Sequence, residues 1–453
     1  MKLAIIGGGG FRTPFVWQAL IRDTGSQRVS EVVLFDRDTA RLEVMHQILT
    51  QLAADFPDAP TLRLTTDLDD AVADSDFLFV ALRVGGIEGR QCDEHVALDL
   101  NVLGQETTGP GGIAYALRTV PVMMDLAQRV ARLAPKAFVI NFTNPAGIIT
   151  EAMQQVLGDR VVGICDTPSG LGRRLARAIG AAPGSVRMDY VGLNHLGWMR
   201  RLLVDGKDVL PEILEDDAIL DSMEEGEVFG KDWIRMLGAL PNEYLYYYYF
   251  NRDAVRGIIS SELTRGDFLA KTQPDFFARA AADRDNAAAI WDAEVNHRRS
   301  NYMAEAKGFS QGEAQAGERP READAAHQGY AGVALAVMAA IGRDEPSTLI
   351  LNVRNGHTLP QLPVSAVIEV PTLVDGSGVN PLATTPLDGH AAGLMQQVKE
   401  VEQLAIQAAM TGDLQLAIKA FALHPLVDSV SVARELFAGY RAGLPDLASV
   451  FGG

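Results

Sequence analysis

The sequence predicts an α/β fold, in which a Rossmann-like, doubly wound parallel sheet is followed by a mixed, helix-rich C-terminal domain. Three features of the 453 residues carry this prediction: recurring short apolar runs, amphipathic segments between them, and a change of pattern after Pro168. Apolar runs of β-branched and aromatic residues that alternate with helices are typical of a parallel sheet covered on both faces. We therefore divide the chain into residues 1–167 and residues 168–453.

The predicted strands of the first domain are short apolar runs. They are 2–6, 31–35, 62–66, 77–82, 137–142 and 160–165. Between successive strands lie segments with the period of a helix. The predicted helices are 13–22, 39–56, 67–75, 119–134 and 146–157. Alternation of this kind places helices on both faces of the sheet.

The second domain has a different pattern. A helix candidate at 170–180 precedes paired strands within 186–210, and long helical stretches follow at 329–341 and 391–423. The polar segment 306–329 is the best candidate for a long mobile loop.

Composition excludes several classes of function. The formal net charge is −18, and the chain has no run of Lys and Arg, so we expect neither nucleic acid nor a membrane surface as a partner. Cys92 and Cys165 are the only cysteines, which favours a reducing compartment. The N-terminal apolar run is too short for a signal peptide or a membrane span. We expect a cytoplasmic protein.

A glycine-rich turn follows the first predicted strand in "KLAIIGGGGFRTPFVWQAL". Gly7, Gly8 and Gly9 would let the backbone approach a pyrophosphate at the N-terminus of the next helix. Arg12 occupies the position of the usual third glycine, so a simple tight turn remains the alternative.

Asp36 strengthens the prediction of a dinucleotide site. It ends the second strand in "LFDRD", where a carboxylate accepts hydrogen bonds from the adenosine ribose and repels the 2′-phosphate of NADP. We therefore expect NAD as cofactor, with Phe11 and Arg12 beside the glycines among its contacts.

Four polar stretches are expected to converge near the nicotinamide, because ligands bind beyond the carboxyl ends of parallel strands. They are "RVGGIEGR", "NFTNPAG", "CDTP" and the "GQETTGPGG" loop. Cys165 and Asp166 end the sixth strand there, and His195 follows in the first hairpin of the second domain. From the residues alone, Cys165 can be an inert core thiol, a nucleophile or a metal ligand with His195. Cys92 is expected to be inert.

The sequence resembles glycoside hydrolase family 4, the NAD-dependent 6-phosphoglycosidases, over essentially the whole chain. The resemblance rests on "GGGGFRTP", "LFDRD", "VGGIEGRQCDE", "LGQETTGPGGIAYALR", "NFTNPAGI", "GICDTP", "GLNHLGW", "LPNEYLYYYYF" and "ELTRGDF". Within the family, the sequence looks closest to actinobacterial 6-phospho-β-glucosidases.

The resemblance implies catalytic roles. Cys165 and His195 match the ligands of a divalent metal, typically manganese, completed by O2 and O3 of the substrate and by water. Ligand softness alone would favour zinc for a thiolate and an imidazole. Asp166 matches the acid that protonates the leaving glycosidic oxygen, and Tyr244 matches the base that removes the C2 proton.

The resemblance also implies substrate contacts. Asn144 and Arg90 match residues that bind the sugar, and Arg265 matches the arginine that pairs with the 6-phosphate. An acidic protein needs guanidinium groups in defined places to hold a phosphate. The alternative for each arginine is an ordinary ion pair. The family further implies a homodimer or homotetramer.

These residue types suit one reaction. A C2–H bond in a sugar is too weakly acidic for any side chain, but oxidation at C3 by NAD acidifies it, and a metal on O2 and O3 stabilises the enediolate. Elimination then expels the aglycone, water adds, and hydride returns to C3. We therefore expect hydrolysis of 6-phospho-β-glucosides to glucose 6-phosphate and an aglycone.

Alternatives remain at this point. Asp166 follows the metal cysteine where many β-specific members have Asn, so a 6-phospho-α-glucosidase is possible, as is an enzyme for unphosphorylated sugars. The two-domain plan of lactate and malate dehydrogenases allows a 2-hydroxy-acid dehydrogenase, and a non-catalytic NAD-sensing protein is the last alternative. "YLYYYYF" can be a core aromatic strand, which we expect for some of Tyr246–Tyr249 but not for Tyr244.

Overall fold

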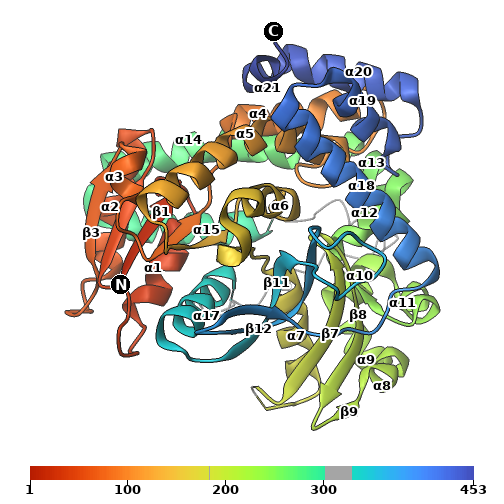
Figure 1. Cartoon of the computed structure of the whole chain (residues 1–453), viewed down its shortest axis with the longest axis horizontal. Coiled ribbons are helices and arrows are strands. Elements are labelled where there is room, and N and C mark those ends of the chain that lie inside the picture. Colours follow the sequence, from red (N-terminus) through yellow and green to blue (C-terminus); the bar gives the residue numbers. More distant parts are fainter. Residues whose placement is uncertain (183, 301–328, 453) are drawn as a thin grey trace.

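The structure is a computed structural model that describes residues 1–182, 184–300 and 329–452 (Figure 1). Except for Gly329, the segment predicted as a mobile loop, 306–329, lies outside the described residues. Within the described ranges, no helix has both the length and the apolar character needed to cross a membrane.

Six parallel strands form one part of the sheet in the order β3-β2-β1-β4-β5-β6. They are β1 (Lys2–Ile6), β2 (Glu31–Phe35), β3 (Thr61–Thr65), β4 (Phe77–Val80), β5 (Phe138–Asn141) and β6 (Val161–Gly163). This is the strand order of a Rossmann fold, so the predicted doubly wound sheet is confirmed. The order reverses between β1 and β4, and ligands bind beyond the carboxyl ends of strands at such a point.

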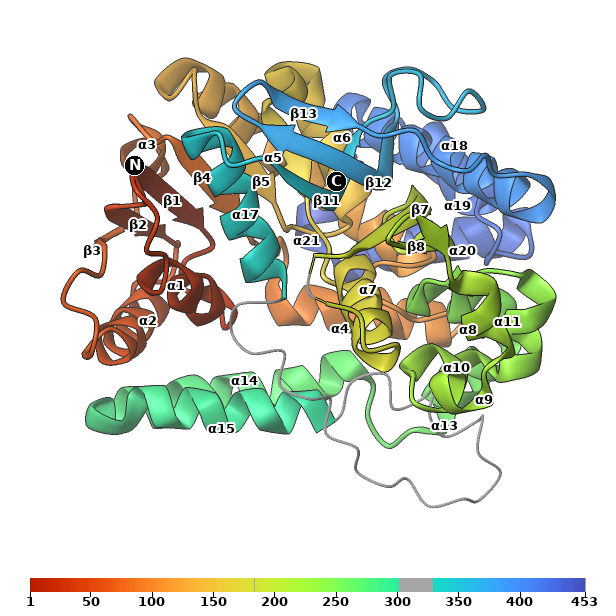
Figure 2. The same cartoon turned by 90° about the horizontal axis from the view of Figure 1, so that it is seen from below.

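The sheet continues past β6 into the second half of the chain. There β11 pairs antiparallel with β6, and β12, β7, β8 and β10 follow in that order (Figure 2). These strands are β7 (Val186–Leu193), β8 (Leu196–Val204), β10 (Leu240–Pro241), β11 (Ser347–Arg354) and β12 (Val367–Asp375), with β9 (Lys207–Asp208) beside β8 and β13 (Gly378–Pro381) beside β12. One sheet thus runs through both predicted domains. The boundary after residue 167 stays a prediction, and it falls at the start of α7 (Thr167–Ala178).

Helices cover both faces of the parallel strands, and alternate strand residues enter two separate cores. Leu3 and Ile5 pack on one face, whereas Ala4 and Ile6 pack on the other. The first face is covered by α1 (Thr13–Ile21), α2 (Thr39–Leu52), α7 and α17 (Tyr330–Arg343). The second is covered by α3 (Leu68–Val72), α5 (Pro110–Leu133) and α6 (Ala146–Leu157). Outside these lie α18 (Gly389–Thr411), α19 (Leu414–Leu423), α20 (Val430–Gly443) and α21 (Pro445–Val450), which pack against α5.

The segment between β8 and β11 is mainly helical where it is described, apart from the two short strands β9 and β10. It contains α8 (Leu210–Glu215), α9 (Asp217–Asp221), α10 (Glu224–Phe229), α11 (Lys231–Leu237), α12 (Tyr246–Tyr249), α13 (Asn251–Ser260), α14 (Arg265–Ala282) and α15 (Ala287–Ser300). Figure 2 shows α14 and α15 as a long antiparallel pair along one side of the molecule. Phe276 and Trp291 of this pair pack with Met45 and Ile48 of α2, so the pair joins the second half of the chain to the first.

In residues 1–167, two helices differ from the prediction: one lies where none was predicted, and one begins earlier than predicted. Helix α4 (Gly86–Leu98) includes the second part of the polar stretch "RVGGIEGR", and α5 begins at Pro110, within "GQETTGPGG". The buried side chains of α4 include Arg90, Asp93 and Glu94. Because these are charged, α4 lacks the apolar period by which a helix is recognised in a sequence.

The expectation of a core aromatic strand within Tyr246–Tyr249 is wrong, because these residues form α12. Tyr246 and Tyr247 are nonetheless buried. The ring of Tyr246 stacks on that of Phe250 with 5.5 Å between centroids. Residues four apart meet on one face of a helix, so helical packing outweighs the strand propensity of the aromatic run.

Candidate active site

The glycine turn after β1 needs glycine for steric reasons. Gly7 has a φ of +92°, which L side chains rarely adopt. The N–H groups of Gly7 and Gly8 both donate to the carbonyl of Phe35, at 2.9 and 2.8 Å. A Cβ on Gly8 would lie 2.7 Å from Cβ of Leu34. The turn therefore packs closely against the end of β2, as a pyrophosphate-binding turn does.

Asp36 lies beside this turn. Its Oδ2 accepts a hydrogen bond from the Gly9 N–H at 3.0 Å, and its Oδ1 accepts one from the Asp38 N–H at 3.1 Å. The carboxylate is half-buried at the end of β2. These residues thus have the arrangement that holds the ribose and pyrophosphate of a dinucleotide in Rossmann folds.

Phe11 and Arg12 are held by residues from the second half of the chain. The indole N–H of Trp291 donates to the Phe11 carbonyl at 3.0 Å, and the hydroxyl of Tyr330 donates to the Arg12 carbonyl at 2.9 Å. The guanidinium of Arg12 lies 5.4 Å from the centre of the Tyr330 ring. Neither aromatic donor was singled out in the sequence, because each lies about 300 residues from its acceptor.

Cys165 and Asp166 lie just beyond the carboxyl end of β6. Burial raises the pKa of the Cys165 thiol well above its ordinary value, and the carboxylates of Glu369 and Asp166 raise it further. Asp166 is exposed at the N-terminus of α7. Burial and the two carboxylates disfavour the thiolate form of Cys165. A bound cation would favour the thiolate and would offset the charge of the carboxylates.

His195 lies in the two-residue turn between β7 and β8, with a φ of +61°. Its Nδ1 is 3.0 Å from Oγ1 of Thr107, and that hydroxyl donates its proton to Oε1 of Gln105 at 3.2 Å. Because the hydroxyl proton is used in that bond, the hydroxyl oxygen accepts a hydrogen bond from Nδ1–H of His195. Nε2 of the neutral imidazole then carries no proton, and its lone pair can bind a metal. Burial lowers the pKa of His195 to about 4, against the opposing effect of Asp166 and Glu106. His195 is therefore a neutral imidazole near pH 7, as a metal ligand must be.

Tyr244 lies directly on His195. The two rings stack with 3.7 Å between centroids and 5° between planes. Tyr244 belongs to a short 3₁₀ helix, Glu243–Leu245, whose first N–H groups are capped by Asn242: its Oδ1 accepts from the Tyr244 N–H at 3.0 Å. The structure thus brings Tyr244, His195 and the end of β6 together.

Arg90 is buried among carboxylates. Its Nε donates to Oε1 of Glu94 and its Nη1 pairs with Oε2 of Glu106, both at 2.9 Å. Arg83 also pairs with Glu106. Burial alone would raise the pKa of Glu106, but Arg83 and Arg90 lower it to about 2. Arg83, Glu106, Arg90 and Glu94 therefore form a chain of alternating positive and negative side chains.

Arg265 and Asn144 occupy the ends of helices. Arg265 is the first residue of α14, and its Nη2 donates to the carbonyl of Arg298 at 3.2 Å. Asn144 is half-buried between β5 and α6, at the carboxyl end of the parallel strands. Their roles as substrate contacts stay predictions.

The donor set fits the groups implied by the family resemblance. The glycine turn with Asp36 fits a dinucleotide, and Cys165 with Nε2 of His195 fits a divalent metal that takes its other ligands from substrate and water. Among the described residues, no group of three or more His, Cys, Asp or Glu side chains is placed to hold a metal ion. A metal held by Cys165 and His195 would therefore need further ligands beyond the described side chains, such as substrate and water.

Sequence reasoning missed several polar residues of the site. Glu106 and Thr107 lie in the "GQETTGPGG" loop, which was expected near the site without roles for its members. Glu369 was not singled out, although a lone acid inside the apolar strand "VIEVPTLVD" is a signal. Its carboxylate accepts hydrogen bonds from Asn352 at 2.9 Å and Asn194 at 3.3 Å, and burial raises its pKa to about 7.

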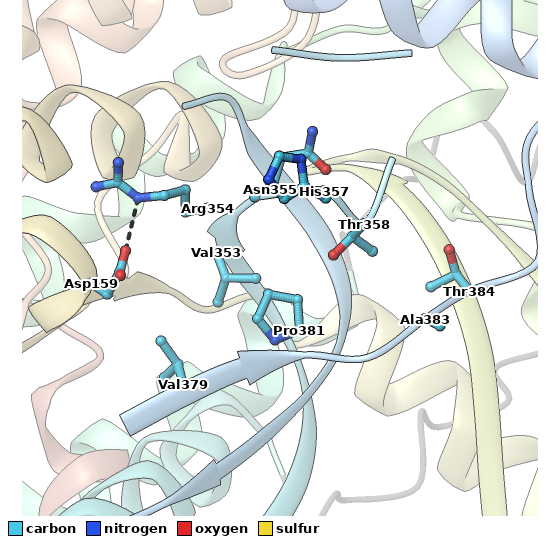
Figure 3. A pocket seen from close by; sticks show the side chains of 11 residues that line it. Asp159, Val353, Arg354, Asn355, His357, Thr358, Val379, Pro381, Ala383 and Thr384 are labelled. Atoms are coloured by element: carbon cyan, nitrogen blue, oxygen red, sulfur yellow. Dashed lines mark hydrogen bonds and ion pairs between the residues drawn. The ribbon is translucent and has the colours of Figure 1, made fainter. Parts of the chain in front are cut away.

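A separate hollow of about 500 Å³ lies at the other end of the strands (Figure 3). It is lined in part by Arg354, at the end of β11, and Asp159, which precedes β6. These two side chains pair with each other at 2.8 Å. Because β11 is antiparallel to β6, this hollow lies at the amino ends of the parallel strands, opposite the candidate active site.

Comparison with known families bears on the choice between a glycosidase and a dehydrogenase. Residues 2–181 match the model of the family 4 glycosyl hydrolases, and residues 190–427 match the model of the family 4 glycosyl hydrolase C-terminal domain. The chain belongs to glycosyl hydrolase family 4. The family models divide the chain between residues 181 and 190, and they favour a glycosidase over a 2-hydroxy-acid dehydrogenase.

Other family 4 members resemble this chain over almost their whole length. A protein of Bacillus subtilis named as a probable 6-phospho-β-glucosidase is 28 % identical over 460 residues, which cover 98 % of this chain and 97 % of that one. The 6-phospho-β-glucosidase of Thermotoga maritima, solved with manganese, NAD⁺ and glucose 6-phosphate, is 26 % identical with a TM-score of 0.81, over 98 % of each chain.

An α-specific member is also similar. A 6-phospho-α-glucosidase from gut microorganisms, solved with NAD and Mn²⁺, is 25 % identical with a TM-score of 0.81, over 97 % of each chain. Malate dehydrogenase of Plasmodium falciparum, at 15 % identity and a TM-score of 0.50, shares the fold, which confirms the expected dehydrogenase-like plan. The expected closeness to actinobacterial members stays a prediction.

Proposed function

We propose that this family 4 glycosyl hydrolase cleaves 6-phospho-β-glucosides to glucose 6-phosphate and an aglycone. The reaction proceeds by C3 oxidation, C2 deprotonation, elimination, addition of water and re-reduction at C3. NAD and a divalent metal, most readily Mn²⁺, are its cofactors. When bound, NAD supplies a hydride acceptor for C3 and the metal supplies a Lewis acid for O2 and O3 of the sugar.

The protein's own residues orient the groups and move the protons. The hydroxyl of Tyr244 takes the C2 proton, and Asp166 delivers a proton to the departing glycosidic oxygen. Cys165 and Nε2 of His195 hold the metal. The glycine turn and Asp36 hold NAD at the switch point between β1 and β4, along the same edge of the sheet as the carboxyl end of β6.

Asn144, Arg90 and Arg265 bind the substrate in this proposal. Arg90 is already paired with two carboxylates. Its charge is therefore largely offset, which suits hydrogen bonds to sugar hydroxyl groups. Arg265 provides the charge-assisted contact to the 6-phosphate.

The observation that carries the proposal is the stacking of Tyr244 on His195 at 3.7 Å, with the imidazole within electrostatic reach of Asp166, the residue after Cys165. A phenol in contact with a metal-ligating imidazole lies close to a cation, which favours its phenolate and makes it a competent base. A 2-hydroxy-acid dehydrogenase has no use for a tyrosine base in this position.

The test is hydrolysis of paired 4-nitrophenyl 6-phosphoglucosides of both anomers, with NAD and Mn²⁺ each omitted in turn. We expect nitrophenol release from the β-anomer only when both are present, without net NADH. Turnover in D₂O should place deuterium at C2 of the recovered glucose 6-phosphate. Turnover without NAD, or failure of C2 exchange, would contradict the mechanism.

The same assay separates the alternatives. The α-anomer is tested because Asp166 follows the cysteine and because α-specific relatives are similar to this chain. Faster nitrophenol release from the α-anomer than from the β-anomer would make the protein a 6-phospho-α-glucosidase. Equal turnover of unphosphorylated glucosides would remove the 6-phosphate from the proposal. Absence of turnover on every substrate would favour a non-catalytic NAD-binding protein.

A cytoplasmic location and a homodimer or homotetramer complete the proposal. The two free cysteines support a reducing compartment. Size-exclusion chromatography with light scattering measures the oligomeric state directly, and a monomeric mass for the active enzyme would contradict it.

A further inference from the structure

Glu94, a buried residue of α4, connects the two arginines that we propose as substrate contacts. Its Oε1 accepts a hydrogen bond from Nε of Arg90 at 2.9 Å, and its Oε2 accepts one from the backbone N–H of Gly266 at 2.7 Å. Gly266 directly follows Arg265 at the start of α14. Only 2 % of Glu94 is exposed, so both bonds form away from water, where such bonds fix geometry most strongly.

The absence of a side chain at Gly266 makes this contact possible. A Cβ there would lie 2.6 Å from Oε2 of Glu94 and 3.3 Å from Cα of Gln91. Gly266 lies in the first turn of α14, and its φ is outside the left-handed region that favours glycine. The helix itself therefore does not call for glycine, and the close approach of Glu94 explains it.

We propose that the contact between Glu94 and Gly266 sets the distance between Arg90 and Arg265 and thereby the preference for a 6-phosphorylated sugar. The inference rests on the proposed function. Glu94 and Glu106 hold the guanidinium of Arg90 on two sides. The amide next to Arg265 is tied to the same Glu94 carboxylate, so a sugar that reaches both arginines meets a fixed spacing. Glu94 itself is a positioning residue.

A second contact between the same two helices supplies a control. Asp267 of α14 lies 3.0 Å from Nε2 of His95, and it also accepts a hydrogen bond from Nε2 of Gln91 at 2.7 Å. The side chain of His95 is 48 % exposed. His95→Ala therefore weakens the contact between α4 and α14 while both bonds of Glu94 remain.

Two variants disturb the Glu94 contact in different ways. In Glu94→Gln the amide has a single acceptor oxygen, so one of the two donors must face an N–H group instead. Gly266→Ala keeps the charge of Glu94 but displaces its carboxylate. If either variant fails to fold, the other still tests the proposal, and circular dichroism establishes folding.

The experiment compares wild type, Glu94→Gln, Gly266→Ala and His95→Ala as holoenzymes. For the 4-nitrophenyl 6-phosphoglucoside that the wild type prefers, we expect both contact variants to raise KM by about tenfold. We expect kcat to change by less than about threefold, because the reacting groups are untouched. The calorimetric dissociation constant of glucose 6-phosphate should rise with KM, and that of NAD should not change. His95→Ala should match the wild type.

The possible contrary results are distinct. If the contact variants bind glucose 6-phosphate as the wild type does, the inference is wrong and the proposed function stands. If His95→Ala raises KM equally, general docking of α14 explains the effect and the inference is also wrong. If the wild type neither binds glucose 6-phosphate nor turns over phosphorylated glucosides, the proposed function fails and the inference fails with it.

Discussion

The imidazole of His195 and the phenol of Tyr244 lie face to face, 3.7 Å apart and within 5° of parallel. Each ring is fixed from a different element. Thr107 holds Nδ1 of His195, and Asn242 caps the short helix that carries Tyr244. The predicted base and the predicted metal ligand therefore keep one relative orientation, although they come from segments about 50 residues apart.

Tyr244→Phe tests the base. The phenylalanine ring preserves the stacking on His195 but removes the hydroxyl that accepts the C2 proton. We expect kcat to fall by about 10²-fold or more, since general bases contribute about that much. Isothermal titration should give an unchanged dissociation constant for NAD. A kcat within about twofold of wild type would remove Tyr244 from this role.

Cys165→Ser tests the metal site, and Cys92→Ser is its matched control. Cys92 is half-buried on α4, where its Sγ packs against Gly443 of α20. Because serine is a poor ligand for the metal, we expect the Mn²⁺ dissociation constant, measured by electron paramagnetic resonance, to rise by at least about tenfold in Cys165→Ser. The control should bind Mn²⁺ like the wild type. Equal binding by both variants would contradict the assignment.

Thr107→Val tests the orientation of His195. Valine has the shape of threonine but cannot accept from Nδ1–H, so the imidazole loses the bond that directs Nε2 to the metal. We expect Mn²⁺ affinity to fall by about 10- to 100-fold, as for other residues that orient metal ligands. Thr108→Val is the matched control, because the buried Oγ1 of Thr108 has no hydrogen-bond partner among the described residues. An equal effect of the two changes would refute the role of Thr107.

His424 predicts a pH dependence of stability. It is buried after α19, its Nδ1 accepts from the Leu426 N–H, and burial lowers its pKa from 6.5 to about 3. Between these values the unfolded chain binds a proton that the folded protein excludes, so the free energy of unfolding falls as pH falls from 6.5 towards 3. One proton corresponds to at most about 1.4 kcal/mol per pH unit.

The check is urea unfolding of wild type and His424→Asn at pH 7.5 and pH 5. Asparagine can accept from the same N–H without titrating. The variant should therefore lose less stability than the wild type between the two pH values. Equal losses would show that His424 does not exclude a proton in the folded state.

The sequence predicts the parallel half of the fold well, because each strand is an apolar run whose alternate residues enter two cores. The β7–β8 hairpin and helices α17 to α19 follow from equally plain periodicity. Helix α4 is missed because its buried face carries Arg90, Asp93 and Glu94, and burial of charged groups depends on partners that only the tertiary structure supplies. The aromatic residues of α12 have strand propensity, which packing overrides.

The candidate site is predicted in its residue types but not in its connections. Motifs point to Cys165 and His195, yet the bond from Thr107 and the stacking with Tyr244 join positions far apart in the chain. Glu94 and Gly266 are 172 residues apart. No local pattern encodes such a pair.

The three-residue strand β6 lies between β5, made shortly before it, and β11, made long after it. While the ribosome is still translating the intervening segment, the nascent chain carries β6 as an unsatisfied edge that another polypeptide can join. Expression of the first 167 residues alone would make that vulnerable stage permanent. Slow elongation should therefore lower the yield of intact enzyme, and a chaperone that binds the nascent chain should raise it.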